Sequence, residues 1–212
     1  LDEHDENNIK LDNLLNNKKN IISLFAGSRE SEIKIHSPIL FDFIKKMNKK
    51  TKDLNFIFHS SAKFKDYLIN LLKKTDILNV DIISDEKIKN EILKKSIFAV
   101  VKSGTVSLEV CKLNIPSIII YKMNYINFYI AKALLKIKYV NMLNIINDKE
   151  IIPELIQKDC NSEEIFKSVY YMLNKPDLIR NQLQNIKSTI DQIKSQSSST
   201  NEASKVLISY LT

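Results

Sequence analysis

Short apolar, β-branched runs alternate with longer amphipathic segments over residues 20–120. Amphipathic helices that alternate with short buried strands are typical of βαβ units, in which right-handed crossovers place helices on both faces of a parallel sheet. The pattern therefore predicts an α/β, Rossmann-like fold. It places strands at 21–26, 54–59, 80–83, 97–101 and 115–120, and helices at 32–50, 62–75, 85–95 and 104–114.

The pattern changes after residue 120, where helical segments dominate. Pro176 separates the helical segments 162–174 and 177–195. At the other end of the chain, the polar residues 1–19 look like a linker or entry segment. We expect one domain over 20–175, and C-terminal helices over 176–212 that pack on another domain or on a partner chain. The predicted elements are a basic aromatic helix at 124–138, an extended piece at 139–144, and helices at 150–157, 162–174, 177–195 and 202–211.

The chain holds only two glycines, Gly27 and Gly104, and each follows an apolar run beside a serine. Glycine is retained where a backbone must turn or be approached closely. In open α/β sheets a glycine at a strand-to-helix turn marks the place where phosphates bind, because the helix N-terminus offers N–H groups and the positive end of its dipole.

The second turn carries the strongest local signal, Ser103-Gly104-Thr105 followed by Glu109. Its backbone N–H groups and two hydroxyls suit a diphosphate, and Glu109, one helical turn later, suits the hydroxyls of a ribose. The alternative is a serine cap at a tight turn with Glu109 on the surface.

The first turn carries Gly27-Ser28-Arg29. An arginine at the carboxyl end of a strand suits bidentate pairing with a phosphate. The alternative is a surface arginine paired with Glu32. Neither turn has the dinucleotide or Walker glycine pattern.

Charge and residue content limit which partners and which catalytic or metal-binding groups the chain can have. The net charge of +7 fits a lysine-solvated surface, or an anionic partner such as nucleic acid or a membrane. Lysines and aromatics at 122–138 fit a membrane-surface helix, or a core helix with lysines in water. Cys111 and Cys160 have no CxxC partner, and the histidines lack the spacing of metal ligands. No nucleophile–base pair is visible, and His59 suits a core or rim position better than that of a catalytic base.

Five blocks in order make the chain resemble the C-terminal half of the lipid-A-disaccharide synthases. The family's blocks Pro-Gly-Ser-Arg-x-x-Glu and Ser-Gly-Thr-x-x-Leu-Glu look like 26–32 and 103–109, with Ala26 in place of proline. Its strand Pro-Met-Val-Val-x-Tyr-Lys/Arg looks like 116–122. Its segments Tyr-Val-Ser-Leu-Pro-Asn and Val-Pro-Glu-Leu-x-Gln look like 139–144 and 152–157, with Leu143 in place of proline.

The resemblance implies the C-terminal, donor-binding half of a GT-B glycosyltransferase. Such an enzyme moves 2,3-diacylglucosamine from UDP-2,3-diacylglucosamine to 2,3-diacylglucosamine 1-phosphate, with inversion and release of UDP. It needs no metal or other cofactor, and its general base lies in the N-terminal half, so we expect no catalytic residue here and no activity from this chain alone. The implied donor-binding residues are Gly27, Ser28, Arg29, Ser103, Gly104, Thr105, Glu109 and Asn144.

The resemblance also implies a peripheral protein on the cytoplasmic face of the inner membrane of a Gram-negative bacterium. A homodimer through the C-terminal helices is a further expectation, and no nucleic-acid partner is expected. Because the chain starts at Leu1, we expect it to be part of a longer protein. Two alternatives stay open. One is another GT-B enzyme, an epimerase or a peptidoglycan glycosyltransferase, and the other is a non-enzymatic basic module that binds anionic lipid or nucleic acid.

Overall fold

The computed structural model describes residues 18–124 and 138–196, and the chain divides into two compact units, residues 1–100 and 101–212. Strand order along the sheet is β3-β2-β1-β4-β5-β6, with β4 (Ser96–Lys102) running from the first unit into the second. The α/β fold predicted from the alternating pattern is confirmed.

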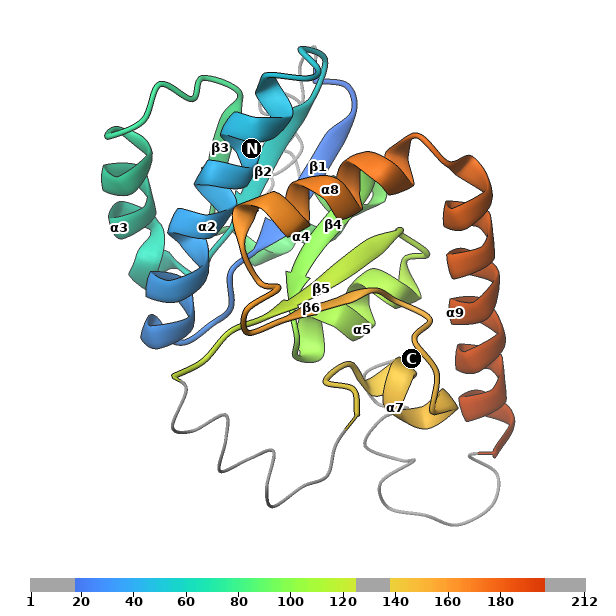
Figure 1. Ribbon diagram of the computed structural model, residues 1–212. Coiled ribbons are helices and arrows are strands. Elements are labelled where there is room, and N and C mark those ends of the chain that lie inside the picture. Colours follow the sequence, from blue (N-terminus) through green and yellow to red (C-terminus); the bar gives the residue numbers. More distant parts are fainter. Residues whose placement is uncertain (1–17, 125–137, 197–212) are drawn as a thin grey trace, which may run out of the picture. The chain divides into compact units, whose positions relative to one another are not determined.

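The first unit is a parallel sheet with a helix after each strand (Figure 1). The register pairs Ile22 with Phe56, and Phe56 with Val80. Its strands are β1 (Ile21–Phe25), β2 (Asn55–His59) and β3 (Val80–Ile83), and its helices are α2 (Glu30–Asn48), α3 (Ala62–Leu72) and α4 (Glu86–Lys94).

Helices cover both faces of this sheet because side chains alternate along each strand. On one face, Phe58 of β2 stacks on Phe41 of α2, with ring centres 5.4 Å apart. On the other face, Ile57 joins a buried cluster with Ile88 and Ile92 of α4. The near-continuous apolar strands of the sequence are therefore buried on two sides.

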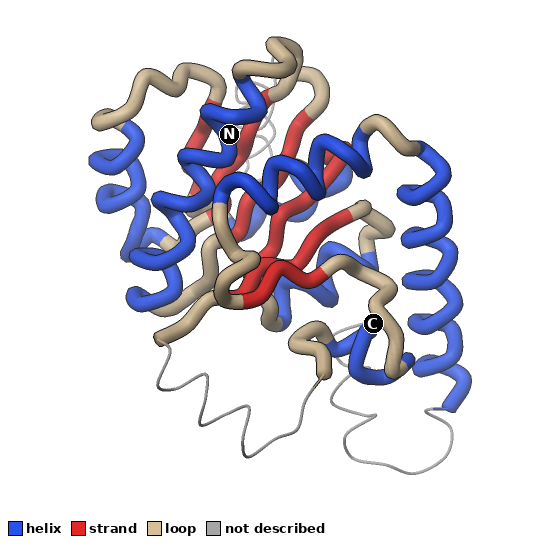
Figure 2. The backbone as a smooth tube through the Cα atoms, in the orientation of Figure 1, coloured by secondary structure: helices blue, strands red, loops and turns tan. Residues whose placement is uncertain are grey.

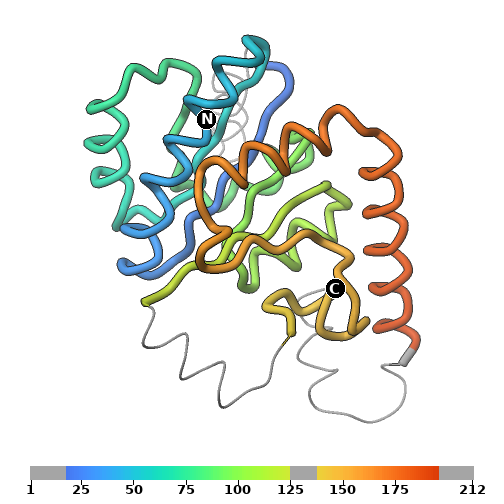
Figure 3. Tube along the Cα trace, viewed as in Figure 1, coloured from blue at the N-terminus to red at the C-terminus, as the bar shows by residue number. Residues whose placement is uncertain are grey.

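The second unit continues from the end of β4 through alternating strands and helices (Figures 2 and 3). β5 and β6 pair in parallel, with Ile120 opposite Leu155. Its elements are α5 (Thr105–Lys112), β5 (Ser117–Tyr121), α7 (Met142–Asn147), β6 (Glu154–Ile156), α8 (Ser162–Leu173) and α9 (Pro176–Gln196).

The long helix α9 packs within the second unit, against α5, α7 and α8. Gln182 on α9 accepts a hydrogen bond from Ser117 N at 2.9 Å and donates one to Ser117 O at 2.8 Å. Ile186 and Ile190, on the same face of α9 as Gln182, are also buried. The described part of the segment 176–212, α9, covers its own unit, because apolar side chains recur along one face and Gln182 holds the start of β5. The expectation that this segment packs on another domain or on a partner chain stays a prediction.

Two predictions after residue 138 were wrong. Residues 150–157 are not a helix: Glu154–Ile156 form the strand β6, and Ile119 N of β5 donates to Pro153 O at 2.8 Å. Residues 139–144 are not simply extended, because Asn141 caps α7 by accepting a hydrogen bond from Leu143 N at 3.0 Å.

Two further predicted helices, 202–211 and all but the ends of 124–138, lie outside the described residues. No helix within the described ranges has the length and apolar character needed to cross a membrane.

Candidate functional site

The turn after β1 needs its glycine. Gly27 has φ +116°, and a Cβ added there would lie 2.4 Å from Glu32 Oε2. The same oxygen accepts hydrogen bonds from Ser28 N at 3.0 Å and Arg29 N at 3.2 Å. Glu32 thus caps the start of α2 from within the chain, as in a capping box.

Arg29 sits at the N-cap of α2 with its side chain exposed. The alternative predicted for it, an ion pair with Glu32, is not found among the described residues, because the Glu32 carboxylate caps the backbone instead. The guanidinium therefore faces solvent at the carboxyl end of β1, where an anion can reach it.

The turn after β4 is held from two sides. Ser103 N donates to Ile120 O at 3.1 Å, and Ser103 Oγ donates to Val140 O at 2.7 Å. Since a hydroxyl has one proton, the expected donation from Ser103 to a diphosphate would require this bond to break. In the structure Ser103 positions the turn.

Gly104, at the N-cap of α5, is exposed and extended. A Cβ added there would meet only Lys102 O, at 4.0 Å, so the space beside the turn is open. Thr105 begins α5 and is also exposed. The first N–H groups of a helix have no acceptor within it. This turn therefore offers backbone donors, a hydroxyl and room for an approaching group.

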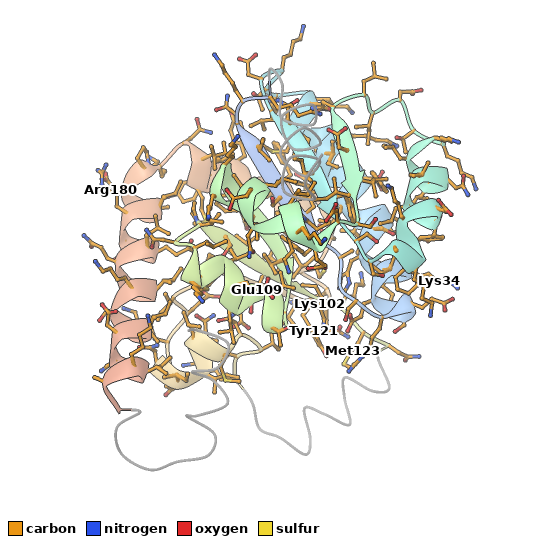
Figure 4. All side chains as sticks on the ribbon, turned by 180° about the vertical axis from the view of Figure 1, so that it is seen from behind. Lys34, Lys102, Glu109, Tyr121, Met123 and Arg180 are labelled. Carbon is orange, nitrogen blue, oxygen red and sulfur yellow. The ribbon has the colours of Figure 1, made fainter. Side chains whose placement is uncertain are left out.

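Glu109 lies one turn into α5 and is partly exposed. Figure 4 labels it together with Lys102 and Tyr121, the last residues of β4 and β5. Lys102 Nζ lies 5.3 Å from the centre of the Tyr121 ring, within the range of a cation–π contact. Lys102 was not predicted as a site residue, although a lysine directly after four buried residues was a visible signal.

Asn144 does not present its amide to a ligand. The residue is fully buried. Its Nδ2 donates to Ile152 O and to Glu154 Oε1, each at 2.7 Å, and its Oδ1 accepts from Ile151 N and Ile152 N at 2.8 and 3.0 Å. Because these contacts use its whole hydrogen-bonding capacity, the expectation of direct donor binding does not fit.

Glu154 on β6 organises the same segment and was missed as a functional residue. Its carboxylate accepts from Val140 N at 2.8 Å and Asn141 N at 2.9 Å. Asn141 also donates to Ser107 Oγ at 3.2 Å, and Ser107 Oγ donates to Gly104 O at 2.6 Å. A continuous network therefore ties β6 and α7 to the turn at Gly104.

Apart from the buried Asn144, the predicted site residues fall into two groups. Gly27, Ser28 and Arg29 follow β1 in the first unit, and Ser103, Gly104, Thr105 and Glu109 surround the start of α5 in the second. The structure brings the members of each group together.

The two cysteines and His59 lie in the described part of the chain and have no features of catalytic groups. Burial raises the pKa of Cys111 to about 12 and that of Cys160 to about 11, so both thiols stay protonated and are poor nucleophiles at neutral pH. Burial lowers the pKa of His59 to about 3, and its Nε2 lies 2.9 Å from Ser23 Oγ. His59 is therefore a core residue, as its position suggested. No cluster suited to a metal ion occurs in residues 18–124 or 138–196.

Comparison with solved structures shows the fold. The C-terminal domain of a glycosyl transferase group 1 family protein from Francisella tularensis superposes with a TM-score of 0.53 at 15% identity, covering 81% of this chain and 84% of that one. The UDP-GlcNAc 2-epimerase from Neisseria meningitidis, solved bound to UDP-GlcNAc, gives a TM-score of 0.55 at 14% identity, covering 96% of this chain and 48% of that one.

Sequence comparison is more specific. A lipid-A-disaccharide synthase from Sulfurihydrogenibium is 34% identical over 176 residues, which are 79% of this chain and 45% of the relative. The chain thus spans about half the length of the curated relatives it matches. The family model described as lipid-A-disaccharide synthetase matches residues 2–208. The chain belongs to the lipid-A-disaccharide synthetase family.

Proposed function

We propose that this chain is the donor-binding half of a lipid-A-disaccharide synthase. The whole enzyme would transfer 2,3-diacylglucosamine from UDP-2,3-diacylglucosamine to 2,3-diacylglucosamine 1-phosphate and release UDP. The observation that carries the proposal is the open turn at Gly104, in a chain that belongs to this family. A chain with two glycines in 212 residues keeps one where its own packing does not require it. A ligand that binds close to the backbone at this turn would explain why the position is glycine, since glycine has no Cβ to block its approach.

The proposed roles follow from the chemistry of each group. Thr105 and the N–H groups at the start of α5 would bind the diphosphate, and Glu109 would accept the hydroxyls of the ribose. Arg29, from the turn at Gly27 and Ser28, would pair with a phosphate group of the donor. Negative charge grows on UDP as the glycosidic bond breaks, so the Arg29 guanidinium and the α5 dipole would stabilise the transition state.

We assign the acceptor site and the general base to residues beyond this chain, as the resemblance to the family implies. Because both substrates are lipids, we place the enzyme as a peripheral protein on the cytoplasmic face of the inner membrane. Dimerisation through C-terminal helices remains a proposal for the whole protein. Residues 20–175 and 176–212 keep their proposed roles as binding domain and C-terminal helices.

The epimerase alternative has support from fold alone, because the solved epimerases that match this chain share 14% identity with it. The basic-module alternative rests on net charge. Titration with UDP at two salt concentrations separates that alternative from the proposal, because binding of a polyanion weakens steeply with salt and shows little preference for UDP.

Arg29→Ala tests the proposed site. Loss of a charged hydrogen-bonding partner should weaken UDP binding by about 1.5–3 kcal/mol, measured by isothermal titration calorimetry. The matched control is Arg180→Ala, which removes the chain's other arginine, an exposed residue on α9 that pairs with Asp177. A folded Arg29→Ala variant with wild-type affinity for UDP would refute the role of Arg29.

A further inference from the structure

A positive charge stands directly beside the proposed diphosphate turn. Lys102 ends β4 after four fully buried residues, 98–101, and its own side chain is partly exposed. The next two residues are Ser103 and Gly104. The family block that suggested the site begins at Ser103, so Lys102 lies outside it.

The lysine is held in place by its neighbours. Its Nζ lies 5.3 Å from the ring centre of Tyr121, which ends the adjacent segment β5 (Figure 4). The backbone that follows is fixed as well, because Ser103 N donates to Ile120 O and Ser103 Oγ donates to Val140 O. A cation held by an aromatic face on an anchored strand end loses little freedom when it binds an anion.

The open space beside Gly104 borders the same residue. The nearest atom to a Cβ added at Gly104 is the carbonyl oxygen of Lys102, at 4.0 Å. Lys102 thus precedes the open turn by two residues along the chain. A lysine ammonium carries a full positive charge and N–H donors, which suit a phosphate group.

We propose that Lys102 is a further donor-binding residue that contacts the diphosphate from the second unit. This inference rests on the proposed function. It adds a cation to the proposed diphosphate turn at the start of α5. In the reaction, Lys102 would bind UDP most strongly as negative charge develops on the leaving diphosphate.

The test compares UDP with uridine, which lacks the phosphates, on the 212-residue chain. Lys102→Met keeps the aliphatic stem on Tyr121 and removes the charge. It should weaken UDP binding about tenfold or more in calorimetry, while uridine binding, followed by ligand-observed NMR, should not change. Lys102→Arg should restore most of the UDP affinity. Lys112→Met, at the exposed far end of α5, is the matched control and should bind UDP like the wild type.

The outcomes separate the two claims. If the wild type binds UDP and Lys102→Met binds it equally well, this inference is wrong and the proposed function stands. If Lys102→Met loses UDP and uridine in equal proportion, the lysine only supports local structure, and the inference is again wrong. If the wild type binds no UDP, the proposed function fails, and the role of Lys102 fails with it.

Discussion

At the scale of single residues, His59 is a buried neutral group whose protonation opposes folding. It stacks on Phe25 with ring centres 4.3 Å apart, and its Nδ1 has no hydrogen-bond partner in the structure. Burial, reinforced by nearby Lys89, lowers its pKa from the usual 6.5 to about 3. Below pH 6.5 the unfolded chain binds a proton that the folded chain does not. The stability contribution is therefore complete above pH 6.5 and is lost as the pH falls toward 3.

This linkage predicts a measurable loss at mild acidity. Between roughly pH 7.5 and pH 5, the wild type should lose about 2 kcal/mol more unfolding free energy than a His59→Phe variant, which keeps the stack on Phe25. Urea unfolding at both pH values measures the difference. Equal losses in the two proteins would show that His59 titrates normally in the folded state.

At the scale of elements, the two strand-to-helix turns use glycine for different reasons. Gly27 has a positive φ, and a Cβ there would collide with Glu32. Gly104 is extended, with open space beside it. Gly27 is required by the backbone conformation, and we propose that Gly104 allows a ligand to approach the backbone.

Alanine at each turn should therefore give opposite results. Gly27→Ala should lower the free energy of unfolding by about 1–3 kcal/mol, because it combines backbone strain with a clash. Gly104→Ala should change it by no more than about 0.5 kcal/mol, yet should weaken UDP binding because the methyl group fills the open space. Chemical denaturation of both variants measures the unfolding free energy, and calorimetry measures the affinity for UDP. Destabilisation by Gly104→Ala would mean that this glycine is structural.

Helix α9 offers a test of how the second unit is held together. Gln182→Ala would leave Ser117 N and Ser117 O, both buried, without partners, and should cost about 2–4 kcal/mol of unfolding free energy. Gln184, exposed on the same helix, is the control, and its alanine variant should stay within about 0.5 kcal/mol of the wild type. Similar stability of the two variants would show that α9 docks without the Gln182 contacts.

Strands and helices up to β5 could be predicted because each is long enough to show its period. β6 could not, since three residues cannot display alternation and its pairing with β5 is a distant contact. At the site, Gly104 and Glu109 could be placed from the strand–turn–helix order. The burial of Asn144 could not be predicted, because it depends on Glu154 and on the backbone at 151–152, which only folding brings together.

At the scale of the whole molecule, family membership and fold agree, and the chain spans about half of its relatives. The central claim is that the turn at 103–105, at the start of α5, binds the diphosphate of UDP. In the proposed roles this turn supplies Thr105 and the N–H groups of the helix N-terminus, and Glu109 on the same helix accepts the hydroxyls of the ribose. Binding of UDP should therefore change the surroundings of the backbone amides at the start of α5.

The most direct test is a UDP titration of the ¹⁵N-labelled chain, followed by NMR of the backbone amides. We predict that the amides of Gly104 and Thr105 shift along one saturation curve as UDP is added, and that the amides on the exposed face of α9 stay unchanged. No shift at Gly104 and Thr105, or shifts of the same size on α9, would contradict donor binding at this turn.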